Sequence, residues 1–108
     1  MQEVLEGLYA VVQQRKAEPQ EGSYTCYLFE KGLDKILKKC GEECSEVIIA
    51  AKNGVQEETV GEICDLLYHL LVMMADQNIP LEAVEEVLEQ RRQKIGNLKQ
   101  FHVSDHNT

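Results

Sequence analysis

Acidic side chains are concentrated in two short segments of the chain, residues 42–46 (EECSE) and residues 62–65 (EICD). In each segment two carboxylates are three residues apart, so they occupy one face if the segment is helical. The two pairs are Glu43 with Glu46, and Glu62 with Asp65. Carboxylate oxygens are the ligands that hard divalent cations prefer. The spacing therefore indicates a metal site shared between two helices.

The clustering of these carboxylates opposes folding unless their charge is neutralised. Like charges at this helical spacing cost roughly 0.2–0.5 kcal/mol per pair, and partial burial raises that cost. Mg²⁺ offsets such repulsion, because it binds carboxylates while keeping waters and substrate phosphates as further ligands. A set without histidine favours Mg²⁺, or Mn²⁺ as a substitute, over zinc. The alternative is that both segments are solvated charged faces of ordinary helices.

Basic and titratable residues accompany the two acidic segments. Lys38 and Lys39 lie one turn before the first segment, and Lys39 is four residues before Glu43. Lys39 could pair with this carboxylate or contact a phosphate oxygen beside the metal. His69 is four residues after Asp65 and could hydrogen-bond to it from outside the metal shell. A salt-bridged surface and an ordinary half-buried histidine are the alternatives.

The four cysteines show no metal-binding or disulfide spacing. They are Cys26, Cys40, Cys44 and Cys64, and none forms a CxxC pair. Cys40 and Cys44 could suggest zinc together with a histidine, but we expect both to face the core, away from the carboxylates. Reduced, buried thiols are the prediction.

Apolar residues recur with the 3,4 spacing of amphipathic helices in four segments. The predicted helices cover residues 2–17, about 34–53, about 57–77, and a last segment that starts near Pro80 and includes Val84, Val87, Leu88 and Ile95. Asp34 is the expected N-cap of the second helix, and Asn53-Gly54 is a typical helix end. No useful stretch alternates with a period of two. We therefore predict an all-α fold, a bundle of four main helices.

The segments between the helices position the acidic residues. Residues 23–32 have no clear period, and we expect a loop there with at most one short helical turn; residues 96–108 should form an irregular tail. The turn near residues 54–56 is short, so the helices that flank it must pack antiparallel. Counting outward from this turn places residues 43–46 level with residues 62–65. All four carboxylates should then converge beside the apolar stripes.

Length and charge restrict the classes of protein. A chain of 108 residues is one domain, because two halves would each lack a sufficient core. The formal net charge of −8 disfavours nucleic acid and anionic membranes as partners. No segment reads as a signal peptide or a membrane-spanning helix, so we expect a cytoplasmic protein. Leu66, Leu70 and Met73 form a stripe too wide for one partner helix, which predicts a homodimer.

Longer segments of the sequence resemble one enzyme family. The segment SYTCYLFEKGLDKILKKCGEECSEVIIAAKN, followed by EICDLLYHLLVMM, resembles phosphoribosyl-ATP pyrophosphohydrolases of histidine biosynthesis, over about residues 2–95. The most specific parts are SYT at 23–25, KKxGEExxE at 38–46 and ExxDLLYH at 62–69. The EExxE…ExxD pattern alone is shared with the wider all-α pyrophosphohydrolase superfamily, which includes MazG and dimeric dUTPases.

The resemblance implies a MazG-like dimer that hydrolyses phosphoribosyl-ATP to phosphoribosyl-AMP and pyrophosphate with Mg²⁺. By that resemblance the metal ligands are Glu43, Glu46, Glu62 and Asp65. Glu42 would orient or deprotonate water, and Lys38 and Lys39 would contact phosphates. Because Met1 opens directly on the first helix, the stand-alone form of the enzyme is expected rather than a fusion.

Some alternatives remain open at the level of sequence. Ser23, Tyr24 and Thr25 could close over the substrate as a loop, or form a turn that caps a helix. The chain could be a housecleaning nucleotide pyrophosphohydrolase of the same superfamily, acting on a deoxynucleoside triphosphate. It could also be a non-catalytic helical dimerisation module whose acidic groove binds a basic partner.

Overall fold

Five helices make up residues 1–96, the part of the chain that the computed structural model describes. They are α1 (Gln2–Ala17), α2 (Tyr24–Lys31), α3 (Leu33–Asn53), α4 (Gln56–Asp76) and α5 (Leu81–Gly96). No strand occurs among these residues, which confirms the all-α prediction. The predicted tail and the side chain of Ile95 lie outside the described part. Within it, none of the helices has the length and apolar character needed to cross a membrane.

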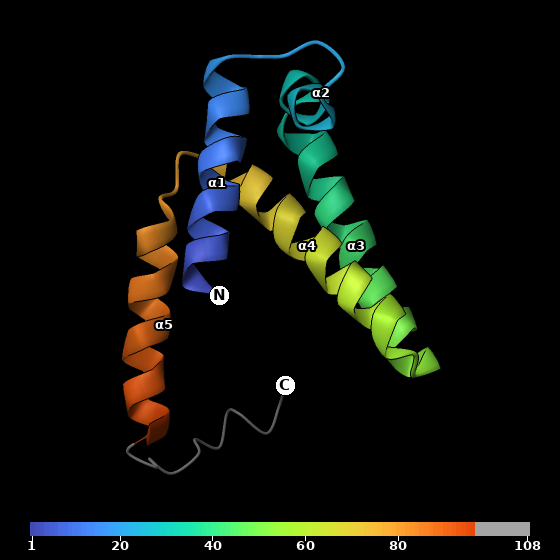
Figure 1. The fold of residues 1–108 in the computed structure, drawn as a ribbon, viewed down its shortest axis with the longest axis vertical. Coiled ribbons are helices and arrows are strands. Elements are labelled where there is room, and N and C mark those ends of the chain that lie inside the picture. The colour runs from blue at the N-terminus through green and yellow to red at the C-terminus, as the bar shows by residue number, and fades with distance from the viewer. Residues whose placement is uncertain (97–108) are drawn as a thin grey trace.

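The longest helices, α3 and α4, form an antiparallel hairpin with 21 residues in each arm. Gly54 ends α3 in the left-handed conformation, with φ 78°, and its N–H bonds to the carbonyls of Ala50 and Ala51. Glycine adopts this conformation without a steric penalty. Val55 follows, and α4 begins at the next residue. The predicted hairpin and its glycine end are confirmed. In Figure 1 the arms lie together near this turn and separate toward the end where α1 and α2 lie.

The C-terminal end of α4 is held by α1. The Tyr9 hydroxyl donates a hydrogen bond to the carbonyl of Ile79. The Lys16 ammonium donates to the carbonyl of Ala75 at 2.7 Å and to Asn78 Oδ1 at 3.0 Å. A lysine at this place satisfies carbonyls that the helix itself leaves unpaired and interacts favourably with the negative end of its dipole. These bonds fix the turn that leads into α5.

All five helices contribute to one hydrophobic core. The buried apolar side chains are Tyr9 and Val12 of α1, Leu28 of α2, Ile36 of α3, Leu71, Val72, Met74 and Ala75 of α4, and Leu81 of α5. The α4 members all lie in its C-terminal half. The core is therefore displaced from the α3–α4 turn, and the acidic segments lie between the two.

The segment expected to be a loop is a helix instead, so the prediction for residues 23–32 was wrong. The Ser23 side chain caps α2 by accepting a hydrogen bond from the backbone N–H of Cys26 at 3.2 Å. Leu28 is completely buried, at 0% exposure. An eight-residue helix is too short to show a sequence period, and burial against the other helices stabilises it. The predicted count of four main helices becomes five.

Two smaller predictions about local structure also need correction. Gly32, with φ 95°, is the N-cap of α3, whereas Asp34 lies in the first turn. All four cysteines are free thiols, but Cys44 and Cys64 are exposed and the other two are half-buried. Helical spacing placed these thiols on apolar stripes. No other helix of residues 1–96 covers the faces of the hairpin on which the two exposed thiols lie.

The burial of Leu28 gives a test of α2. Replacing Leu28 by alanine should lower the free energy of unfolding by about 2–5 kcal/mol, because the change removes a fully buried side chain. The matched control is Leu37→Ala on α3, where the leucine is 42% exposed and the loss should be about 1 kcal/mol or less. Urea denaturation measures both. Equal small losses would show that residues 23–32 do not pack as α2.

Candidate active site

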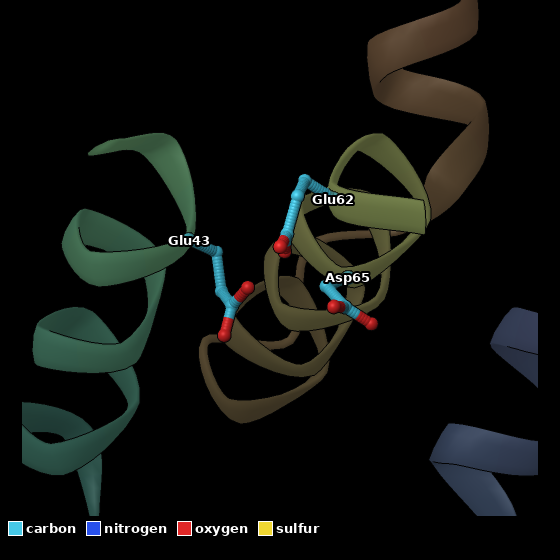
Figure 2. A group of neighbouring side chains, drawn as sticks. All are labelled: Glu43, Glu62 and Asp65. Atoms are coloured by element: carbon cyan, nitrogen blue, oxygen red, sulfur yellow. The ribbon is translucent and has the colours of Figure 1, made fainter. Parts of the chain in front are cut away.

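Three carboxylates meet between the arms of the hairpin. Glu43 projects from α3 toward Glu62 and Asp65 of α4, as Figure 2 shows. One oxygen from each of the three lies within 4.8 Å of the others. Glu46, one turn further along α3, lines an open groove of about 400 Å³ together with Glu62 and Asp65. The hairpin therefore brings together residues that the sequence separates into two segments.

Glu43 is the buried member of this carboxylate cluster. Only 6% of the residue is exposed, and its Oε2 atom has no hydrogen-bond partner among residues 1–96. Burial raises the pKa of the Glu43 carboxyl, and the neighbouring carboxyls of Glu46 and Asp65 raise it further, while His69 lowers it. A buried carboxylate oxygen without a partner is costly, because desolvation removes the water that would otherwise bind it. Such an oxygen is chemically suited to bind a hard cation.

Glu62 also holds its proton more tightly than an ordinary glutamate. Its pKa is raised by partial burial, and then by the negative charges of Glu46, Asp65 and Glu43. Both pKa shifts combine burial, the larger cause, with repulsion from the neighbouring carboxylates. An all-carboxylate set around an unpartnered oxygen fits a hard divalent cation such as Mg²⁺ or Mn²⁺.

One lysine reaches the cluster. The Lys39 ammonium lies 3.3 Å from Glu42 Oε1 and 3.7 Å from Glu43 Oε1, so it is shared between the two carboxylates. Glu42 is about half exposed and lies outside the group of three facing carboxylates. Lys38 is exposed on the same turn of α3. The predicted contact between Lys39 and Glu43 is thus present, and Glu42 is its second partner.

His69 is 5% exposed and has a partner on each ring nitrogen. Its Nδ1 lies 2.7 Å from the main-chain carbonyl of Asp65, and its Nε2 lies 2.9 Å from the Tyr24 hydroxyl. A carbonyl oxygen only accepts, so Nδ1 carries the proton and Nε2 of the neutral ring accepts from Tyr24. His69 therefore bonds to Asp65, as expected, but to its backbone rather than its carboxylate.

The SYT segment belongs to the first turn of α2. Ser23 is the N-cap, and Tyr24 and Thr25 are helical. The Thr25 hydroxyl is hydrogen-bonded to the hydroxyl of Tyr68 on α4. A loop over the substrate was the wrong conformation for these residues, and the capping turn describes them better. The sequence motifs predicted no role for Tyr68, although it belongs to the LYH motif beside His69.

A second groove lies beside α2. It has a volume of about 780 Å³ and lies between the end of α1 and α2, where Arg15, Lys16 and Tyr27 are among its lining residues. Tyr24 lines this groove too, and is near enough to Glu43 for that charge to raise its pKa, in addition to the larger effect of burial. The group of three facing carboxylates, Glu43, Glu62 and Asp65, lies in the hairpin and not among the residues that line this groove.

Comparison with known proteins identifies the family. The sequence profile described as "Phosphoribosyl-ATP pyrophosphohydrolase" matches residues 5–92, a span that contains both acidic segments. A protein of Clostridium botulinum (strain Kyoto / Type A2) named "Phosphoribosyl-ATP pyrophosphatase" is 59% identical over 96 residues, which cover 89% of this chain and 87% of that protein.

Relatives with the same name occur in other bacteria. The protein of Clostridium acetobutylicum is 56% identical over 98 residues, 91% of this chain and 89% of its own length. The protein of Listeria monocytogenes serotype 4b (strain CLIP80459) is 53% identical over 96 residues, 89% of this chain and 92% of its own length. The resemblance inferred from the motifs is confirmed, and this chain belongs to the phosphoribosyl-ATP pyrophosphohydrolase family.

Proposed function

We propose that this protein hydrolyses phosphoribosyl-ATP to phosphoribosyl-AMP and pyrophosphate, a step of histidine biosynthesis. The family membership and the name shared by the relatives support the substrate. The observation that carries the chemistry is the carboxylate cluster around the unpartnered Glu43 oxygen. Hydrolysis of a phosphoanhydride needs positive charge beside the phosphates, and this cluster is built to hold a cation rather than to bind an anion directly.

The residues proposed to hold Mg²⁺ are Glu43, Glu62 and Asp65, with Glu46 completing the set from the adjoining groove. Bound Mg²⁺ would neutralise the carboxylates, clamp the phosphates and lower the pKa of a coordinated water. Mn²⁺ offers similar geometry and should substitute. The chain's net charge of −8 makes such a cation necessary for a polyanionic substrate to approach.

The remaining polar residues act on the substrate and the water in this proposal. Lys39, already between two carboxylates, is placed to contact a phosphate oxygen at the edge of the cluster, and exposed Lys38 adds positive charge nearby. Glu42, which directly precedes Glu43 in the chain, has a half-exposed carboxylate and is the candidate base that takes the proton of the attacking water. Water attacks one phosphorus of the α–β anhydride, and pyrophosphate leaves.

The first prediction concerns the reaction itself. The purified protein incubated with phosphoribosyl-ATP and Mg²⁺ should release phosphoribosyl-AMP and pyrophosphate in equal amounts, and EDTA should stop the release because the carboxylates alone cannot bind phosphates. Chromatography with pyrophosphate detection measures it. A panel of deoxynucleoside triphosphates is the control. A higher kcat/KM for one of these would replace the proposed substrate with the housecleaning alternative.

The metal site makes a two-part prediction about Glu62→Gln and Asp65→Asn. Each variant should lose hydrolysis, because a ligand is lost. Each should also melt at a higher temperature than wild type in EDTA, because repulsion within the cluster is relieved. Saturating Mg²⁺ should raise the melting temperature of wild type on the order of 10 °C at a hundredfold excess over Kd, and the variants should lose most of that rise.

Glu86→Gln is the matched control for these melting curves, because Glu86 is exposed on α5, outside the hairpin that holds the cluster. It should keep both the activity and the full Mg²⁺ response. If the cluster variants instead lose stability in EDTA and keep the wild-type Mg²⁺ response, then these carboxylates are structural and the assigned site is wrong.

We further propose a cytoplasmic homodimer of a single catalytic domain, with neither nucleic acid nor membrane as partner. Large apolar side chains on the hairpin support a second copy, because they are exposed in the single chain. They are Ile48 and Ile49 of α3, and Val60 and Ile63 of α4, with exposures of 66%, 60%, 50% and 42%. Leu66, Leu70 and Met73, the stripe expected at the interface, are half-buried along α4.

Dimerisation has its own test. Light scattering at micromolar concentration should give twice the chain mass of 12.3 kDa. Ile48→Lys should shift the mass toward the monomer, because a charge would then be buried in the interface. Val11→Lys on α1 is the control, because it makes the same change to lysine at another exposed apolar position, and this variant should remain dimeric. A monomer mass for wild type across the micromolar range would reject the proposed assembly.

A further inference from the structure

The two arms of the hairpin are tied at both ends, on either side of the carboxylate cluster. The turn at Gly54 and Val55 joins them at one end. At the other end the tie runs through α2, which packs on both α3 and α4. A single residue, Gly32, separates α2 from α3, so whatever fixes α2 on α4 also fixes the start of α3.

The contact between α2 and α4 is polar and aromatic. Tyr24 donates to His69 Nε2 at 2.9 Å, and Thr25 is bonded to Tyr68. The Tyr24 ring stacks on that of Tyr68 at 6.3 Å between centroids and meets the His69 ring edge-on at 5.7 Å. The thiol of Cys40 on α3 completes the arrangement by donating to the main-chain carbonyl of His69 at 3.5 Å.

We propose that the hydrogen bond from Tyr24 to His69 is a positioning device for the metal site, which holds α3 and α4 at the separation the cation requires. Tyr24 and His69 are positioning residues in this inference, and neither touches the metal. The inference rests on the proposed metal site. It adds that the site's affinity depends on a bond made by a helix that supplies no ligand.

The physical argument begins with repulsion. Glu43 stands on one arm, and Glu62 and Asp65 stand on the other, so their mutual repulsion drives the arms apart whenever the cation is absent. The turn resists this at one end only. The bond between Tyr24 and His69 resists it at the other end, four residues of α4 beyond Asp65. A site held near its bound geometry loses less free energy on binding, and so binds more tightly.

The state of His69 favours this role over direct coordination. Its Nδ1–H is committed to the main chain of Asp65, which sets the orientation of the ring, and its Nε2 lone pair is occupied by the Tyr24 hydroxyl. No lone pair of the ring is then free for a metal. The ring of His69 is 5% exposed, so the acceptor side of this bond is shielded from water, although Tyr24 itself is 45% exposed.

The test is a calorimetric titration of Mn²⁺ alone into substrate-free protein. Tyr24→Phe keeps the ring and removes the hydroxyl, and the Kd for Mn²⁺ should rise about three- to tenfold, the weakening expected from one lost neutral hydrogen bond. The Mg²⁺ concentration for half-maximal turnover should rise by a similar factor. Tyr27→Phe is the matched control on α2, because its exposed ring faces Tyr24 and Lys31 rather than α4; its Kd should equal that of wild type.

A second variant separates positioning from stability. His69→Asn retains an N–H for the Asp65 carbonyl but has no acceptor at the position of Nε2, where Tyr24 donates, so it should weaken Mn²⁺ binding by a factor like that of Tyr24→Phe. The double variant should be no weaker than either single one, because both remove the same bond. Circular dichroism and urea denaturation establish that each variant is folded. A merely structural role would change the free energy of unfolding measured in urea and leave the Kd for Mn²⁺ unchanged.

The outcomes discriminate between the two proposals. A Kd within twofold of wild type in either single variant, or factors that multiply in the double variant, would overturn the positioning role and leave the metal site intact. Wild-type protein that does not bind Mn²⁺ would overturn the metal site itself. The positioning role would be established if Tyr24→Phe, His69→Asn and the double variant all raise the Kd by the same factor while Tyr27→Phe leaves it unchanged.

Discussion

Repulsion among the carboxylates that the α3–α4 hairpin brings together is the constraint on which the arrangement of this protein depends. Glu43, Glu62 and Asp65 converge within 4.8 Å, and only Lys39 among the described residues pairs with a member of this group. That lysine is itself shared with Glu42. One ammonium cannot neutralise such a cluster, so the folded chain keeps a concentration of negative charge that its other contacts must withstand.

The remaining helices are placed where they counter this repulsion. The core gathers around the C-terminal half of α4, and α1 binds the end of that helix through Tyr9 and Lys16. Burial of apolar surface there contributes stability without approaching the acidic groove. Because of this separation one end of the hairpin is well packed while its middle remains charged, so that stability and the proposed cation binding are supplied by different residues.

Sequence patterns predicted the hairpin well, because its long arms repeat their apolar spacing several times and Gly54 marks the turn. The register of the carboxylates followed from counting outward from that turn. Such reasoning could not find α2, whose eight residues are too few for a period and whose stability comes from burial of Leu28. Nor could it find the partner of His69, because Tyr24 is 45 residues away in the chain. The exposed thiols of Cys44 and Cys64 show the same limit: spacing identifies a stripe but not whether another helix covers it.

The difference between the carboxylate motif, which a superfamily shares, and the motifs specific to the family bears on substrate choice. In the proposed function the carboxylates serve the cleavage of a phosphoanhydride, and the EExxE…ExxD pattern, which is shared across a superfamily, does not explain the choice of nucleotide. The motifs that distinguish the family from the superfamily are KKxGEE, AAKN and LYH, and SYT is among the most specific parts of the resemblance. In the structure three of these motifs lie toward the α2 end of the hairpin: Tyr24 opens α2, Lys39 precedes Glu43 on α3, and His69 follows Asp65 on α4. The fourth, AAKN at residues 50–53, lies at the other end, beside the turn at Gly54. Because Tyr24 also lines the groove beside α1, the α2 end joins the charged site to a second surface. Most of the motifs that distinguish the family therefore lie where α2 meets the hairpin, next to this second surface.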